Sequence, residues 1–592
     1  MSVSESPEQV HWDLSDLVAG TGEDPVGQLM DEASDRAGSF AARYRGALET
    51  IDGEGLAEAM NELAAIHDLA GRAGSYAGLD FATDTTDPAR GALVARVEER
   101  STAIATALLF FELEWAALSD ERVEALLAHD GLDFCRHHLR TARRYRPHLL
   151  SEPEELILTE KSLSGASAWT RLFGELTSAI EVSLEETETL DVALSRLSSP
   201  SRDVRRDSAR AITTALEPGL RTRAFIFNTL LVDKATDDRL RHYENWLSAR
   251  NLANEASDES VEALVTAVTG RYELARRWYR LKASLLGIDR LADYDRSAPL
   301  ATDDAEMDWP SARDLVLDAY ASFSPALGDL AGRFFAERWI DAPPGHGKQG
   351  GAFCAYTVPS VHPYVLLNFT GRRRDALVIA HELGHGVHAA LAAKQGIFHQ
   401  STPLTLAETA SVFGEALTFG ALLEASPTPA ARLALLAEDI EGAIATVFRQ
   451  ITMNRFERLA HTERREVGEL SVERLGELWG QTQEEFFGDS VEVTDDYRSW
   501  WSYIPHFINT PGYVYAYAYG QLLALSVYDR YLAEGPGFEQ RYLELLSSGG
   551  SRSPEDLGEI VGVDLRDPGF WDRGLDIVER RLEAAEQAAE AL

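Results

Sequence analysis

Apolar residues recur every three or four positions along most of the chain, which is the spacing of one face of an α-helix. The pattern is clear over residues 56–73 and 93–118, and it returns over 202–290 and 577–589. The last of these stretches is rich in charge and is expected to lie on the surface. The sequence therefore predicts a mainly α fold.

One helical stretch, His381–His388 (HELGHGVH), carries three histidines and a glutamate. His381 and His385 are four positions apart, so their imidazoles lie one turn apart on the same face, about 6 Å along the axis. Both can bind a single Zn²⁺ at roughly 2.0–2.1 Å, with the carboxylate of Glu382 beside the ion rather than on it. This pattern is typical of zinc peptidases.

The context of the motif supports a helix. Asp375 precedes the motif by one to two turns, and helix-forming residues continue to Gly396. The alternative is a buried amphipathic helix whose histidines bind nothing, which would leave costly polar groups to satisfy. His388 lies seven residues after His381, about 10 Å along the axis and too far to share one ion. We interpret His388 as a residue that supports the metal ligands or lines a channel.

A catalytic zinc usually takes three protein ligands and a water molecule. Glu408 is the best candidate for the third ligand, in a stretch (residues 406–415) that predicts a second helix. The same glutamate, with Thr405, also fits a capping box, in which it would serve the helix and not the metal. The spacing alone leaves both possibilities open.

The predicted second helix has small residues on one side, which would let it pack closely against Gly384 and Gly386. Glu415 lies seven residues after Glu408 and is a candidate for orienting a histidine ligand. Zinc lowers the pKa of its bound water to around 7 and polarises a scissile carbonyl. Glu382 would accept the proton of that water and pass it to the leaving amine.

The motif region resembles the oligopeptidases of peptidase family M3, the thimet oligopeptidase and oligoendopeptidase F group, and is most similar to the oligoendopeptidase F branch. His381–His388 is similar to the family pattern H-E-[FL]-G-H-x-x-H, and residues 406–415 are similar to L-A-E-x-A-S-x-x-x-E. The resemblance implies that Glu408 is the third ligand of one catalytic Zn²⁺, and so favours the ligand over the capping box.

A second block, residues 504–521, also resembles the family. The resemblance implies that His506, Tyr513 and Tyr517 donate hydrogen bonds to the substrate and to the developing oxyanion. Four tyrosines stand at every second position from Tyr513, and we expect half of them to be packing residues. The alternation suggests a strand, whereas the apolar run at 521–525 favours a helix.

Upstream of the motif, Gly347–Cys354 leads into the apolar run at 364–369. This region resembles the family's glycine-rich loop and active-site strand. An exposed strand edge beside the metal, formed by Gly351, Ala352 and Phe353, is expected to hold an extended peptide by β-augmentation.

The resemblance covers most of the chain and implies an architecture: two helical lobes that enclose a deep substrate channel, with a small β-sheet beside the zinc helix. Such a channel would admit short, unfolded peptides and exclude folded proteins. It implies three sequence regions: an N-terminal helical region (1–110), an oligoendopeptidase F-like N-terminal domain (111–197) and the zinc metallopeptidase domain (198–592).

The chain of 592 residues has 96 acidic and 56 basic residues, a formal net charge of −40, and only five of the bases are lysine. A surface this acidic stays hydrated where salt screens its self-repulsion, so we infer a salt-loving organism; an ordinary acidic enzyme is the alternative. Nucleic acid and anionic membranes are poor partners for such a field.

The beginning of the chain lacks the basic and apolar parts of a secretory signal, and no run reaches eighteen uncharged apolar residues. Cys135 and Cys354 are far apart in sequence and are expected to be reduced. These features predict a cytoplasmic protein.

The leading hypothesis is a zinc-dependent endopeptidase that turns over oligopeptides in the cytoplasm. A zinc aminopeptidase would need a segment that recognises a free α-amine, and no G-x-M-E-N-like segment is present. A binding module with a structural zinc would need a fourth ligand or lack the base, whereas Glu382 is present.

Overall fold

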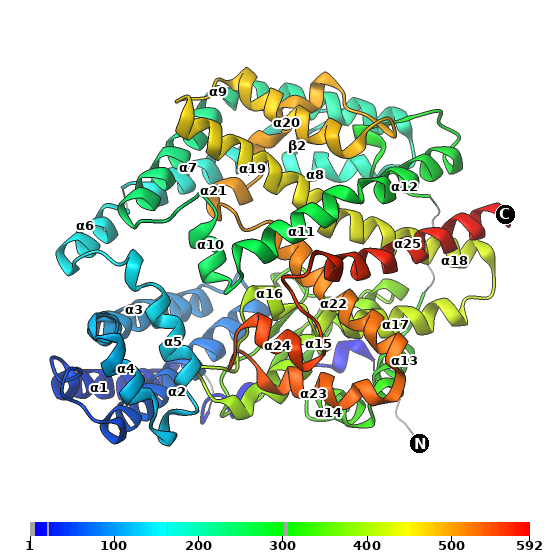
Figure 1. Ribbon diagram of the computed structural model, residues 1–592. Coiled ribbons are helices and arrows are strands. Elements are labelled where there is room, and N and C mark those ends of the chain that lie inside the picture. Colours follow the sequence, from blue (N-terminus) through cyan, green and yellow to red (C-terminus); the bar gives the residue numbers. More distant parts are fainter. Residues whose placement is uncertain (1–5, 21–22, 163, 301–305) are drawn as a thin grey trace. The chain divides into compact units, whose positions relative to one another are not determined.

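The computed structural model describes residues 6–20, 23–162, 164–300 and 306–592, and these residues are mainly helical (Figure 1). Their internal contacts divide the chain into two compact units. Unit 1 contains Met1–Arg146, Asp304–Ala425 and Val527–Asp564, and unit 2 contains Pro147–Asp303, Ser426–Ser526 and Leu565–Leu592. Each unit therefore draws on three separate stretches. The predicted mainly α fold is confirmed; the substrate channel and the three sequence regions stay predictions.

Unit 1 begins with three long helices that lie side by side: α1 (Glu23–Tyr44), α2 (Gly53–Thr83) and α3 (Pro88–Ala117) (Figure 1, blue). Helix α3 begins where Asp87 accepts a hydrogen bond from the Ala89 N–H and Pro88 occupies the first turn. The ring centroid of Phe40 lies 5.6 Å from that of Phe111, which packs α1 against α3. Two shorter helices follow, α4 (Asp120–Leu127) and α5 (Arg136–Arg144).

A three-stranded sheet in unit 1 has the order β4-β6-β5. Strand β6 (Tyr364–Leu366) is central and buried; β4 (Ile340–Asp341) pairs with it in parallel and β5 (Phe353–Ala355) antiparallel. Helix α15 (Arg373–Ala392) packs against β5 and β6. The predicted small sheet beside the motif helix is confirmed, and β5 lies at one of its two edges.

Four other helices of unit 1 pack against α15: α13 (Trp309–Phe323), α14 (Pro325–Ala336), α17 (Ser411–Ala425) and α23 (Glu539–Ser548). Unit 1 also contains α16 (Leu404–Ala407), α24 (Pro554–Ile560) and the end of α22 (Tyr515–Glu534). The stretch Thr405–Ala425 is long and apolar enough to cross a membrane, and so is the bent pair of α3 and α4 taken together. Since 67% of the first stretch is buried inside the fold, it has the surroundings of a core helix.

Unit 2 is also built of helices with two small sheets. Its helices are α6 (Glu152–Ser162), α7 (Ala166–Ser178), α8 (Leu190–Ser195), α9 (Arg202–Leu240), α10 (Ser248–Ala253), α11 (Asp258–Gly270), α12 (Tyr272–Leu285), α18 (Pro429–Ala443), α19 (Arg449–Glu466), α20 (Val472–Phe487), α21 (His506–Asn509), the start of α22, and α25 (Pro568–Glu590). Strand β1 (Glu181–Ser183) pairs with β2 (Thr187–Thr189), and β3 (Leu291–Ala292) with β7 (Val491–Glu492).

An aromatic cluster forms part of the core of unit 2. The ring of Phe456 in α19 lies 5.4 Å from that of Trp479 in α20 and 5.1 Å from that of Phe507 in α21. Such aromatic pairs add to the burial of their apolar area. The cluster holds the short helix α21 against α19, and so fixes the beginning of the segment that carries His506.

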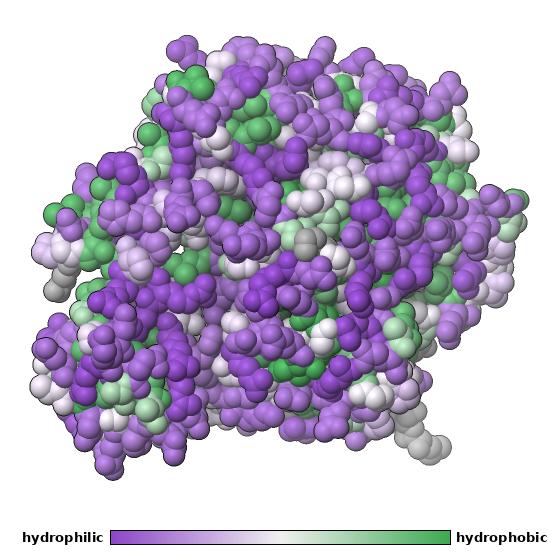
Figure 2. Space-filling model, in the orientation of Figure 1, coloured by the Kyte–Doolittle hydropathy of each residue, from purple (hydrophilic) through white to green (hydrophobic). Residues whose placement is uncertain are grey.

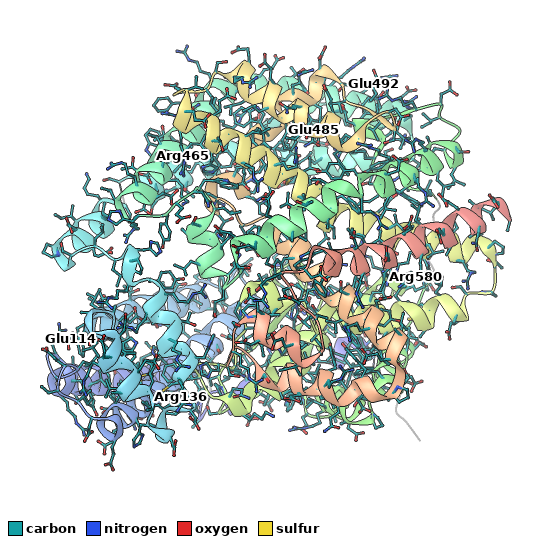
Figure 3. The ribbon with its side chains drawn as sticks, in the orientation of Figure 1. Glu114, Arg136, Arg465, Glu485, Glu492 and Arg580 are labelled. Carbon is teal, nitrogen blue, oxygen red and sulfur yellow. The ribbon has the colours of Figure 1, made fainter. Side chains whose placement is uncertain are left out.

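The surface is hydrophilic over most of the face in Figure 2, with small apolar patches. Charged side chains of both signs project from it, several of them labelled in Figure 3. Glu485 accepts a hydrogen bond from Arg455 at 2.6 Å, and Arg465 pairs with Asp238 at 2.5 Å. These two arginines of unit 2 thus form ion pairs with acidic side chains.

Candidate metal centre

Helix α15 begins at Arg373 because Asp375 satisfies the backbone that leads into it. The Asp375 carboxylate accepts hydrogen bonds from the backbone N–H groups of Thr370 (2.6 Å) and Arg372 (3.2 Å). The helix runs to Ala392, and a short turn then ends at Gly396 with a φ of 76°. The predicted start and end of this helix are confirmed.

The structure brings His381, His385 and Glu408 together. One carboxylate oxygen of Glu408 lies 3.3 Å from Nε2 of His381 and 3.4 Å from Nε2 of His385. One potential ligand atom from each residue lies within 4.8 Å of the other two. Two imidazole nitrogens and a carboxylate oxygen form the donor set of many catalytic zinc sites. The three side chains therefore fit a single metal ion.

The prediction of one continuous helix over residues 406–415 is wrong. Helix α16 ends at Ala407 and α17 begins at Ser411, with Glu408 in the intervening turn. Ser411 Oγ donates a hydrogen bond of 2.6 Å to the Glu408 carboxylate. The turn directs Glu408 toward the two imidazoles. The capping box is absent, because α16 begins at Leu404 after Pro403 and Thr405 is not its N-cap.

Gly384 explains how this turn approaches α15. A Cβ atom on Gly384 would lie 2.4 Å from the Ala410 carbonyl oxygen and 2.4 Å from Ser411 Cα. Only glycine permits this contact without displacing the backbone. The predicted packing of Gly386 against the same helix is wrong: a Cβ there would lie 2.5 Å from the ring of Phe334 in α14. Two residues along a helix correspond to a rotation of about 200°, so the two glycines face different neighbours.

Glu415 contacts the first histidine from the other side. Its Oε2 lies 3.2 Å from His381 Nδ1. Burial alone would lower the pKa of His381, but the bonds to Glu408 and Glu415 raise it to about 10. Burial also opposes the charge on Glu408, yet the two histidines hold the pKa of this carboxyl well below its usual range. A proton on Nδ1, shared with Glu415, leaves Nε2 to bind a metal.

Glu382 is only 8% exposed. Burial raises its pKa, the positive charges of His381 and His385 lower it, and a backbone hydrogen bond from Cys354 also lowers it. The net pKa is raised, which makes the carboxylate a stronger base than an exposed glutamate. His388 is buried and lies outside the His-His-Glu group; burial lowers its pKa to about 3, so the ring is neutral at pH 7.

A cavity of about 360 Å³ adjoins this group. The cavity is lined by residues of β5 and its flanks, of helix α15, of the segment between α15 and α16, and of α16. They are Ala352, Phe353, Cys354, Tyr356, Glu382, His385, Ser401, Thr402 and Ala407. Ala352 and Phe353 therefore lie at the same cavity as Glu382. Gly351 is not part of the lining; its carbonyl accepts a hydrogen bond of 2.8 Å from Asn368.

Tyr356 is a site residue that sequence reasoning missed. It lines the cavity, and its ring centroid lies 6.4 Å from that of His385. Burial raises the pKa of Tyr356 well above its usual value, so the phenol keeps its proton. Its position three residues after Phe353, just beyond the segment expected to hold substrate, is the sequence signal that could have identified it.

His506, Tyr513 and Tyr517 lie together in unit 2. His506 Nε2 is 3.4 Å from the Tyr517 hydroxyl, and the rings of Tyr513 and Tyr517 are 5.1 Å apart. Three of the four alternating tyrosines belong to helix α22, which begins at Tyr515, and Tyr513 precedes it. Tyr515 and Tyr519 are fully buried, and their hydroxyls bond to Asn254 and Ser260 at 2.9 Å. The expectation that half of the four tyrosines are packing residues is confirmed.

The helical fold, the edge strand beside an H-E-x-x-H helix and the His-His-Glu group define a metallopeptidase. The chain belongs to peptidase family M3, whose sequence profile matches residues 195–577, and the oligopeptidase F profile matches residues 114–181. It is 27% identical over 562 residues to oligopeptidase PepF of Bacillus subtilis. This alignment covers 92% of this chain and 82% of PepF. The chain is 26% identical to the group B oligopeptidase PepB of Streptococcus agalactiae, over 86% of each chain.

Two solved structures share the fold. One from Chlamydophila abortus superposes with a TM-score of 0.87 at 23% identity, over 99% of each chain. The oligoendopeptidase F of Enterococcus faecium superposes with a TM-score of 0.73 at 22% identity, over 95% of this chain and 98% of that one.

Proposed function

We propose that this protein is a zinc-dependent endopeptidase that hydrolyses internal bonds of short, unfolded oligopeptides. The observation that carries the proposal is the meeting of His381, His385 and Glu408 beside the buried carboxyl of Glu382. Its membership of family M3 makes it a metallopeptidase. The donor set supports zinc as that metal, because two imidazoles and one carboxylate suit Zn²⁺.

A bound zinc ion would supply Lewis acidity to the scissile carbonyl and lower the pKa of water. His381, His385 and Glu408 are the residues that would hold it, and Glu415 would keep the His381 ring in one orientation. Glu382 acts as general base toward the attacking water and then as general acid toward the leaving amine. Burial raises the pKa of Glu382, which strengthens this carboxylate as a base.

The substrate would lie along the outer edge of β5, where backbone hydrogen bonds tolerate many side chains. Gly351, Ala352 and Phe353 are the proposed binding residues, and the cavity that contains two of them also contains Glu382. We assign to His506, Tyr513 and Tyr517 the hydrogen bonds to substrate and oxyanion. His388, on the same helix as the two histidine ligands, keeps a supporting role.

Several relatives are named oligopeptidases, which supports short peptides as the substrate class. We propose that the enzyme finishes peptide turnover in the cytoplasm, without nucleic-acid or membrane partners. The formal net charge of −40 supports a salt-rich setting. There, the thermal unfolding midpoint should rise as KCl increases from millimolar to molar concentrations; a fall would contradict a salt-adapted enzyme.

The experiment uses a random peptide pool with free and acetylated N-termini, digested with and without a chelator and analysed by mass spectrometry. We expect internal cleavage of both pools, loss of activity on chelation, and recovery with stoichiometric Zn²⁺. Cleavage confined to the free N-terminal residue would identify an aminopeptidase instead. Full activity in the fully metal-depleted protein would refute the proposal.

A further inference from the structure

Helix α19 carries a row of buried polar side chains that the proposed mechanism does not use. Asn454, Glu457 and His461 follow each other at intervals of three and four residues, so they share one face of the helix. All three are almost completely buried. Both side-chain polar atoms of Asn454 and both ring nitrogens of His461 lack a hydrogen-bond partner among the described residues, as does Oε2 of Glu457. An apolar face would pack at lower cost, so the acidic member of the row calls for an explanation.

Glu457 holds a turn through its other oxygen. The backbone N–H of Gly512 donates a hydrogen bond of 2.9 Å to Glu457 Oε1. Gly512 has a φ of 74°, a conformation that favours glycine, and a Cβ there would lie 2.7 Å from Leu247 Cδ1 and 3.4 Å from Trp246. The turn is therefore clamped between α19 on one side and the residues that precede α10 on the other.

The clamp belongs to one packed layer of unit 2. The Trp246 ring stacks on His461 of the same α19 face, with centroids 4.7 Å apart and planes at 19°. Arg250 of α10 places its guanidinium 5.9 Å from the Tyr513 ring, and its charge also acts on Glu457. Both walls of the clamp thus contact each other as well as the turn.

The turn leads directly to the proposed oxyanion residues. Tyr513 follows Gly512, its ring lies 5.1 Å from that of Tyr517, and the Tyr517 hydroxyl lies 3.4 Å from His506 Nε2. A displacement of the turn would move the Tyr513 ring and, through it, the edge-on contact with Tyr517. A misplacement of about 1 Å in such a group can cost on the order of 100-fold in rate.

We propose that Glu457 is a positioning residue for the reaction: its buried carboxyl fixes the Gly512 turn and thereby the phenols of Tyr513 and Tyr517. This inference rests on the proposed function of those tyrosines. An apolar side chain at position 457 would pack better. The positioning role explains why this residue is instead an acid that makes one specific bond to the backbone. Glu457 does not touch substrate; it acts through the turn.

The test compares Glu457→Leu, which loses the acceptor, with Glu457→Gln, which keeps a carbonyl acceptor in the same place. Glu463→Gln is the matched control, since Glu463 lies on the same helix and pairs with Arg474 near the surface at 2.7 Å. We expect Glu457→Leu to lower kcat by roughly 10- to 100-fold with KM and zinc content unchanged. Glu457→Gln should stay within about threefold of wild type, and Glu463→Gln should equal wild type.

Hydrogen exchange of the Gly512 amide provides a readout that is independent of activity. We expect fast exchange in Glu457→Leu and protection in Glu457→Gln and wild type. If Glu457→Leu does not fold, the same comparison is made with Gly512→Ala, which keeps the acid and moves the turn. A protected amide in Glu457→Leu, or a normal kcat in a folded variant whose turn has moved, would overturn the positioning role. Full activity of Tyr513→Phe would refute the proposed role of Tyr513 in the reaction. If the Gly512 amide still exchanges as expected in the Glu457 variants, the bond from Glu457 to the turn remains supported.

Discussion

Oε2 of Glu415 lies 3.2 Å from Nδ1 of His381, while Glu408 approaches the other nitrogen of the same ring at 3.3 Å. The imidazole is therefore held between two carboxylates. One of them is placed to share a metal ion with it, and the other fixes its tautomer and its plane. The glutamate that orients the ring comes from α17, one packed layer away from the motif helix.

Glu415→Ala should weaken zinc binding by about 10- to 100-fold, because the ring of His381 loses its hydrogen-bond partner and its preferred tautomer. The measurement is a competition titration against a chromophoric chelator. Glu424→Ala, an exposed glutamate on the same helix, is the control and should leave the affinity unchanged. Equal affinities in all three proteins would show that Glu415 does not support the metal.

Gly384→Ala should destabilise unit 1 by about 1–3 kcal/mol, since the new methyl group would meet backbone atoms at 2.4 Å. Urea denaturation followed by circular dichroism measures the change. Gly332→Ala is the matched control: Gly332 lies inside α14, a Cβ there would meet nothing within 4 Å, and the substitution should stabilise by about 0.4–1 kcal/mol. Equal stability of the two variants would contradict the close contact between Gly384 and the start of α17.

Tyr320 couples α13 to both site helices. Its hydroxyl donates a hydrogen bond of 2.6 Å to the Ala380 carbonyl, next to His381, and a Cβ on Gly414 would lie 1.9 Å from the same hydroxyl. Tyr320→Phe alone should cost about 0.5–1.5 kcal/mol. Gly414→Ala should cost more, and the double variant should recover part of that loss, with a coupling of roughly 1 kcal/mol in a double-mutant cycle. Strict additivity would contradict the contact.

Stability should fall with rising pH because of Glu457. Burial raises the pKa of this carboxyl to about 8, opposed by the Gly512 N–H and by Arg250 of α10; the neighbouring His461 is neutral, since burial holds its pKa well below the usual value. A raised pKa in the folded state means that the folded protein binds the proton more tightly. The resulting stabilisation is complete below about pH 4.5 and is lost as the pH rises through about 8.

The effect is on the order of a few kcal/mol and should appear as a lower free energy of unfolding at pH 9 than at pH 6. Glu457→Gln removes the titrating group and should flatten this part of the profile. An identical pH dependence in wild type and Glu457→Gln would show that another group is responsible.

The sequence predicted the parts of the site that depend on local spacing. His381 and His385 lie on one helical face because four residues make about one turn, and Asp375 marks the beginning of that helix. Glu408 was reached through the resemblance, since its spacing fitted a helix cap equally well. These predictions succeed because the relevant contacts lie within one helix or one recognisable pattern.

The contacts that sequence reasoning missed are between distant segments. The break at Glu408 depends on the approach of Gly384 to Ala410, and Gly386 packs against Phe334 of another helix. Periodicity gives the face of a residue but not the identity of its partner. For the same reason, the sequence pattern does not distinguish Glu457 from other polar residues of α19. Its bond to Gly512 joins two distant segments and is known only from the fold.

In the proposed mechanism, Glu382 activates water at a metal held by His381, His385 and Glu408. Glu382→Gln replaces the base with a neutral group of the same shape and leaves the three ligands in place. Zinc content by mass spectrometry and turnover of a quenched peptide are measured on the same sample. We expect one zinc ion per chain and a kcat lowered by about 100- to 10,000-fold. A variant that keeps both its zinc and its full turnover would contradict the claim.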